Sequence, residues 1–112
     1  MITVEKLKEL GCNTDEGLQR CLGDAGLYLE FIPDALKKER YTELEKLIRD
    51  RNLDEAFKAA HALKGILANL SLDPLLEPVM KMTELLRSRT DTDYSELLSE
   101  MWERFLLFEK EL

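Results

Sequence analysis

Histidine, cysteine, proline and glycine are all scarce in this chain of 112 residues. The single histidine and the scattered Cys12 and Cys21 form neither a His-x-x-x-His nor a Cys-x-x-Cys pair, so a zinc site is not expected. A glycine-rich phosphate loop of the Walker or Rossmann kind is also missing. We therefore expect no metal and no cofactor, and no ATP-dependent phosphorylation of the chain by itself.

Basic residues are outnumbered by acidic ones, 16 to 23, which gives a formal net charge of −7. This balance argues against nucleic acid or an anionic membrane as the main partner. No apolar run approaches the roughly 20 residues that span a bilayer. The start, Met1 to Glu5, lacks a basic region followed by an apolar signal core. We expect a cytoplasmic protein with reduced cysteines whose partner is another protein.

The few prolines and glycines, together with many Leu, Glu, Lys and Ala residues, favour helix throughout. Alternating Val-Ile-Thr runs typical of strands are missing. We expect one domain over residues 1–112, with one or two short helices over about 3–22 and a bundle over about 24–110. Four long apolar stripes joined by short loops predict an all-α fold, an up-down antiparallel four-helix bundle.

Helix starts are predicted from residues whose side chains accept a backbone hydrogen bond. Thr3, Asp24 and Asp54 are expected N-caps, and Asp73 is expected to cap a helix in which Pro74 takes the first position. The stretch from Thr14 to Gly17 resembles a capping box, with Gly17 in place of the usual glutamate. The loop from Thr90 to Asp93 is expected to carry the cap of the last helix.

The segment from Asp24 to Asn52 shows helical spacing but contains Pro33. Proline removes one backbone donor and clashes with the carbonyl four residues earlier, so we expect a kink or break near residues 29–33. A bend in a bundle helix explains such a proline more readily than a functional hinge. The expected core side of this segment consists of Leu27, Phe31, Ala35, Tyr41, Leu44 and Ile48.

The central helix, over about residues 54–71, places its apolar stripe within an arc of roughly 120°. That stripe consists of Ala56, Ala59, Ala60, Leu63, Ile66, Leu67 and Leu70. His61, Lys64, Gly65 and Ala68 stand at i, i+3, i+4 and i+7 on another face. Phe57, at i−4 from His61, joins this outward face. The only histidine is therefore predicted to point away from the core.

This outward face suits phosphoryl chemistry. A largely neutral imidazole has a ring nitrogen that acts as a nucleophile without an auxiliary base. Lys64 places an ammonium one turn away, where it would offset charge on phosphoryl oxygens. Gly65 would let a partner approach closely, at a cost of about 1 kcal/mol of helix stability relative to alanine. The face predicts that His61 accepts a phosphoryl group.

Simpler explanations exist for each residue taken alone. A single outward histidine is usually only a solvated side chain, surface lysines are common, and a helix glycine can serve close packing. Phe57 could equally contact a partner or tuck against a neighbouring helix. Acidic pairs such as Glu43 and Glu45 are best explained as solvated faces. The shared register of His61, Lys64 and Gly65 is what favours a site.

The stretch Ala60-His61-Ala62-Leu63-Lys64-Gly65, followed by Asn69-Leu70, resembles the signature of histidine-containing phosphotransfer (HPt) domains of bacterial two-component phosphorelays. The likeness covers roughly residues 17–110. It implies that His61 is the phosphoacceptor, exchanging a phosphoryl group with receiver-domain aspartates, and that Lys64 stabilises the phosphohistidine. It further implies that Gly65 leaves room for the receiver and that magnesium belongs to the receiver. We expect Phe57, Lys58, Gly65 and Ala68 to be the residues that bind the partner.

The sequence departs from the family pattern at two positions, and two other functions are possible alternatives. The family often has glycine where Ala68 and Ser71 stand. A non-catalytic helical adaptor that sequesters receivers is the main alternative. The phosphoacceptor helix of a sensor kinase fits less well, because its histidine is typically followed by an acidic residue, whereas Ala62 follows here. We expect a monomer, since one bundle can bury all four stripes.

Overall fold

The structure, a computed structural model, describes every residue from 1 to 112 and contains seven helices and no strand. Two short helices, α1 (Val4–Glu9) and α2 (Thr14–Arg20), come first. They are followed by α3 (Ala25–Ala35), α4 (Lys38–Arg49), α5 (Leu53–Asn69), α6 (Asp73–Arg87) and α7 (Ser95–Glu109). The predicted all-α class is confirmed. The molecule is elongated, with extents of 40 × 25 × 19 Å.

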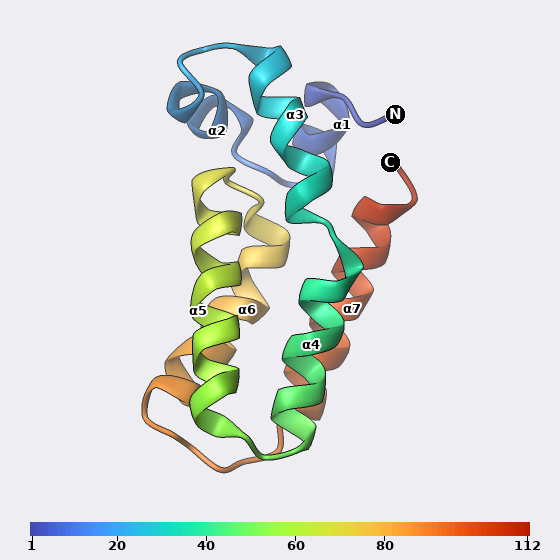
Figure 1. Cartoon of the computed structure of the whole chain (residues 1–112). Helices are drawn as coiled ribbons and strands as arrows, with labels where there is room; N and C mark the ends of the chain where they lie inside the picture. Colours follow the sequence, from blue (N-terminus) through green and yellow to red (C-terminus); the bar gives the residue numbers. More distant parts are fainter.

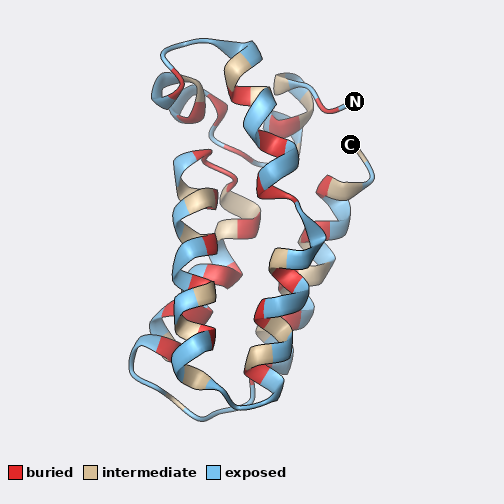
Figure 2. Ribbon diagram, in the orientation of Figure 1, coloured by how far each residue is buried: buried red, intermediate tan, exposed pale blue.

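Helices α4 to α7 pack against their neighbours in chain order, α4 on α5, α5 on α6 and α6 on α7 (Figure 1). Aromatic side chains connect α4 to α7, since the Tyr41 ring lies 4.6 Å from Phe105 and 6.2 Å from Trp102, centroid to centroid. The indole of Trp102 also donates to Glu45 on α4, at 3.1 Å. The helices are thereby grouped around one apolar core, which the buried stripes mark in Figure 2.

The N-terminal helices α1, α2 and α3 lie at one end of the molecule, beside the chain termini (Figure 1). Polar contacts join this end to the junction of α5 and α6. The Tyr28 hydroxyl donates to the Leu70 carbonyl at 2.8 Å, and Arg20 donates to the Ala68 carbonyl at 2.8 Å. At Gly17 a Cβ atom would lie 2.7 Å from the Tyr28 hydroxyl oxygen, so only glycine allows this approach. These contacts fix the end of α5.

The interruption after Pro33 lies further along the chain than predicted. Helix α3 continues past Pro33 to Ala35, and α4 begins at Lys38, so the break falls at residues 36 and 37 rather than near 29–33. The Tyr41 hydroxyl donates to the Ala35 carbonyl at 2.8 Å, and Arg40 donates to the Asp34 carbonyl at 3.0 Å. Side chains from α4 thus satisfy the last carbonyls of α3, which stabilises the end at that point.

The core side of α3 was also predicted wrongly at Phe31, which is 46% exposed. The buried residues of this helix are Tyr28, Ile32 and Ala35. Tyr28 occupies the interior because its hydroxyl finds the Leu70 carbonyl, which removes the cost of burying a polar group. The remaining predicted positions of this segment, Leu27 apart, are buried.

Four predicted caps are replaced by nearby residues, while Thr3 and Asp24 cap as predicted. At α7 the cap position is held by Tyr94 rather than by a residue of the loop from Thr90 to Asp93. Asn13, not Thr14, caps α2 and also donates to Glu16. Asn52 caps α5, whereas Asp54 lies inside the first turn and pairs with Arg89. At α6, Leu72 holds the cap position and Asp73 instead accepts from the Asn13 backbone at 2.9 Å. Tertiary contacts compete for these acidic side chains.

Candidate functional site

The central helix α5 turns one side to the core and the other to solvent. Its buried residues are Ala56, Ala60, Leu63 and Leu67. His61 and Gly65 are exposed on the opposite side, while Lys64 and Ala68 are half-buried at its edge. This is the division that helical spacing predicts. Ala59 and Ile66 of the predicted stripe are half-buried and pack against the core.

His61 lies beside an aromatic ring held by two cations. The Phe57 ring centroid is 5.6 Å from that of His61, with the planes tilted by 44°. The guanidinium carbons of Arg87 and Arg89 each lie 5.1 Å from the same Phe57 centroid. Phe57 therefore packs against the end of α6, as one of its two explanations predicted, and it also contacts His61. Cation–π contacts of this kind are worth about 0.5–1 kcal/mol at exposed positions.

Lys64 differs from the other cations around His61 because no acidic side chain pairs with it. Lys58 pairs with Glu55 at 3.2 Å, Arg87 with Glu84 at 2.9 Å, and Arg89 with Asp54. Half-buried and one turn from His61, the Lys64 ammonium is available to an incoming anion.

Gly65 leaves open space next to His61. A Cβ atom built at this position meets nothing within 4 Å, so no neighbouring helix requires the glycine. Its φ angle is also helical, unlike those of Gly11 and Gly23. Packing and backbone strain therefore do not explain the residue. The space that it leaves is on the solvent side, where another molecule would approach.

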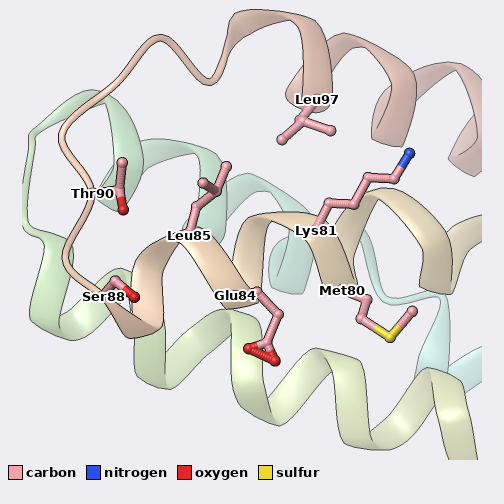
Figure 3. Close-up of a pocket in the computed structure, with 7 residues that line it drawn as sticks. All are labelled: Met80, Lys81, Glu84, Leu85, Ser88, Thr90 and Leu97. Carbon is pink, nitrogen blue, oxygen red and sulfur yellow. The ribbon is translucent and has the colours of Figure 1, made fainter.

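Glu84 of α6 was missed by the sequence analysis, and it brings a negative charge to the site. Its carboxylate points from α6 toward α5 (Figure 3). A hydrogen bond from Arg87 lowers the pKa of Glu84, with further lowering by the charges of Arg87, Lys64 and His61. Glu84 is therefore an ionised neighbour of the outward face of α5.

Glu84 and the two arginines could have been found from the loop between the helices. Because α5 and α6 are joined by a short connection and pack side by side, residues at equal distances from the junction of Leu72 and Asp73 face one another. His61 before this junction and Glu84 after it are each about three helical turns away. Arg87 and Arg89 correspond in the same way to Phe57. The antiparallel register of α5 and α6 was thus the feature from which these three residues could have been predicted.

The groove in Figure 3 does not contain His61. It lies between α6 and α7 and is lined by Met80, Lys81, Glu84, Leu85, Ser88, Thr90 and Leu97. Of its lining residues, Glu84 and Met80 point toward α5 (Figure 3). No group of three or more His, Cys, Asp or Glu side chains is arranged to hold a metal ion, and both cysteines are free thiols. None of the helices is long and apolar enough to cross a membrane.

The fold and site together define an all-helical protein with an exposed histidine, an unpaired lysine and an open glycine on one helix face. The family model described as the Hpt domain matches residues 26–110. The chain therefore belongs to the Hpt domain family, which indicates phosphotransfer in two-component signalling. Hpt domains are phosphocarrier modules rather than kinases, and they interact with receiver domains of response regulators. Neither the curated proteins nor the solved structures include a significant match.

Proposed function

We propose that this chain is a phosphorelay intermediate in which His61 accepts a phosphoryl group from a receiver-domain aspartyl phosphate and passes it to another receiver. The observation that carries the proposal is the shared face of exposed His61, unpaired Lys64 and open Gly65 on α5. Helix geometry holds these three residues in register, so one incoming active site meets them together.

The transfer follows from the chemistry of the imidazole. The lone pair of an unprotonated ring nitrogen of His61 attacks phosphorus, a nitrogen–phosphorus bond forms, and the acyl phosphate bond breaks. The electron pair of that bond leaves with the aspartate carboxylate of the receiver. Lys64 offsets the charge on the phosphoryl oxygens during the exchange. Passing the group onward reverses these steps with a second receiver.

The charges around His61 support a receiver as the partner. The chain as a whole is acidic, with a net charge of −7, yet four cations surround this site. They are Lys58, Lys64, Arg87 and Arg89. Three of these cations are paired with Glu55, Glu84 and Asp54, so Lys64 is the one left to attract the acidic, phosphoryl-carrying active site of a receiver. Phe57, Lys58, Gly65 and Ala68 are proposed as the contact residues on α5.

The proposal also covers the helical architecture, the oligomeric state, the cellular location and the cofactor requirement of the chain. Helices α4 to α7 are proposed to act as an up-down antiparallel four-helix bundle, with residues 1–112 as one domain. The chain is proposed to work in the cytoplasm. It is also proposed to be a monomer, because the apolar sides of its helices meet in a single core. It needs no cofactor of its own, since the magnesium of such transfers belongs to the acidic site of the receiver.

The decisive experiment is incubation with a phosphorylated receiver domain, comparing the native chain with His61→Gln. Acid-labile, base-stable phosphate on the native chain alone would support the carrier. Phosphate on both proteins would exclude His61 as the acceptor. Tight receiver binding without any label transfer would instead favour a non-catalytic adaptor that sequesters receivers.

A further inference from the structure

An ion pair on α6 borders the proposed phosphoacceptor. Arg87 Nε donates to Glu84 Oε2 at 2.9 Å, within the last turn of α6. The Arg87 guanidinium also lies against the Phe57 ring, which in turn lies against His61. Both members of the pair therefore stand close to the imidazole, and Arg89, just beyond the end of α6, lies against the same Phe57 ring.

The two members of this pair would respond oppositely to a phosphoryl group. A phosphoryl group on nitrogen brings about two negative charges to the position that the face of α5 presents. The Glu84 carboxylate, directed toward α5, would repel that charge (Figure 3). Arg87 would be attracted to it, and its bond to Glu84 is exposed enough to exchange. Glu84 also lies close enough to Lys64 and His61 for their charges to act on it.

Building on the proposed function, we propose that Glu84 and Arg87 together set how long the phosphoryl group stays on His61. Glu84 competes with the phosphoryl oxygens for Lys64 and Arg87 and so weakens the phosphohistidine. Arg87 exchanges its hydrogen bond to Glu84 for one to the phosphoryl oxygens and so strengthens it. A carrier has to release what it accepts, and a carboxylate beside the acceptor keeps the phosphoryl group from being held too firmly.

The spontaneous loss of the group provides a measure that needs no partner. In hydrolysis a water oxygen attacks phosphorus, the nitrogen–phosphorus bond breaks, and its electron pair returns to the ring nitrogen. One water proton ends on that nitrogen or in solvent, and inorganic phosphate leaves. Negative charge at Glu84 and positive charge at Arg87 change the stability of the starting phosphohistidine in opposite directions.

The test is to phosphorylate the folded chain with phosphoramidate, a small phosphoryl donor that replaces the receiver, and to follow the phosphohistidine by ³¹P NMR. Glu84→Gln should lengthen its lifetime about threefold, and Arg87→Gln should shorten it by a similar factor, as expected for exposed charges several ångströms apart. Glu77→Gln is the matched control, because Glu77 is an exposed carboxylate two turns away on α6 that pairs with Lys81 and Arg104.

Salt separates an electrostatic role from a structural one. Raising potassium chloride from about 0.05 M to about 1 M shortens the screening length from above 10 Å to about 3 Å, so the differences among variants should shrink toward none. A change of rotamer or packing would leave them unaltered. Opposite shifts for the two variants that fade with salt would support the proposal.

Three results would overturn the proposal: equal lifetimes in all variants, shifts of the same sign for Glu84→Gln and Arg87→Gln, or an equal effect of Glu77→Gln. A chain whose His61 takes no label from phosphoramidate would overturn it too, because no phosphohistidine would exist for Glu84 to influence. Failure of receivers to transfer phosphate, with the lifetimes shifted as expected, would count against the proposed function alone.

Discussion

The rings of Phe57 and His61 lie 5.6 Å apart, tilted by 44°, on successive turns of the outward face of α5. The far side of this contact reaches α6, because Arg87 and Arg89 both lie 5.1 Å from the Phe57 centroid. The exposed imidazole therefore has a support that extends to a second helix. If His61 is the phosphoacceptor that we propose, this support would limit the orientations that its imidazole samples when a receiver binds.

Replacing Phe57 tests this support. Phe57→Leu removes the ring that touches His61, and we expect phosphotransfer to slow about threefold to tenfold as the imidazole loses its orientation. The unfolding temperature should fall by several degrees without loss of the fold, since Phe57 is half-buried and its two cation contacts are worth about 0.5–1 kcal/mol each. Phe57→Tyr keeps the ring and should transfer at nearly the native rate. Equal rates for Leu and Tyr would show that the ring has no role.

Lys64 is expected to bind the phosphoryl oxygens. Lys64→Ala should slow transfer about tenfold and shorten the life of the phosphohistidine, because a charge-assisted hydrogen bond is worth about 1.5–3 kcal/mol. Lys64→Arg should restore part of the rate. The control is Lys46→Ala on α4, an exposed lysine that pairs with Asp50 away from the site. Unchanged kinetics for Lys64→Ala, measured with a phosphorylated receiver, would remove Lys64 from the mechanism.

Two substitutions at Gly65 test the access of a receiver to His61 separately from the stability of the protein. A side chain at this position meets no neighbour, so Gly65→Ala should raise the free energy of unfolding by about 1 kcal/mol, measured by urea denaturation. Gly65→Gln should likewise be folded, but its side chain would occupy the space in front of His61. We expect it to lose transfer from a receiver while still accepting phosphate from phosphoramidate. Transfer that survives this change would contradict the role of the open space.

The buried Cys12 thiol should make the free energy of unfolding depend on pH in the alkaline range. Burial raises the pKa of the Cys12 thiol from 9.0 to about 12, and the negative charge of Asp73 adds to the effect. Because the unfolded thiol ionises first, its contribution to stability is fully present below pH 9.0 and is lost as the pH rises toward about 12. The free energy of unfolding should fall by up to about 1.4 kcal/mol per pH unit from this group.

This slope is best measured between about pH 9 and 10, before the buried tyrosines join, since burial also raises the pKa of Tyr28 and Tyr41 above their usual value of 10.0. Cys12→Ala is the comparison: it lacks the thiol and should show a shallower decline, whatever its stability at neutral pH. Parallel curves for the two proteins would show that the Cys12 thiol does not ionise on unfolding in this range.

Much of the site follows from the sequence, because helical periodicity is a local property. Once residues 54–71 are recognised as a helix, the rise and rotation per residue place His61, Lys64 and Gly65 on one face and Ala60 and Leu63 on the other. The caps at Thr3 and Asp24 were predictable for the same reason, since their partners are three residues away. Interactions of this range depend on little beyond the chain itself.

Helix ends were less predictable where a distant contact decided them. Helices α4, α5 and α6 end with Arg51, Ser71 and Arg89 in the left-handed region, at φ values of 58°, 53° and 52°. Glycine usually marks such positions, and none is present there. Arg51 and Arg89 are each engaged by polar contacts to other segments, the Thr92 carbonyl and Asp54. The preference of a single residue for a turn does not reveal such contacts.

The sequence by itself determined the all-α class and the outward register of His61, since both arise from contacts within a few residues. Only the tertiary structure decided what surrounds the histidine. Glu84 lies near it, and Arg87 and Arg89 lie against its neighbour Phe57, because α6 packs back along α5. On α3, Tyr28 is buried with its hydroxyl bonded to the Leu70 carbonyl, whereas Phe31 is exposed. Such contacts depend on how whole helices pack, which sums many weak interactions that no local pattern records.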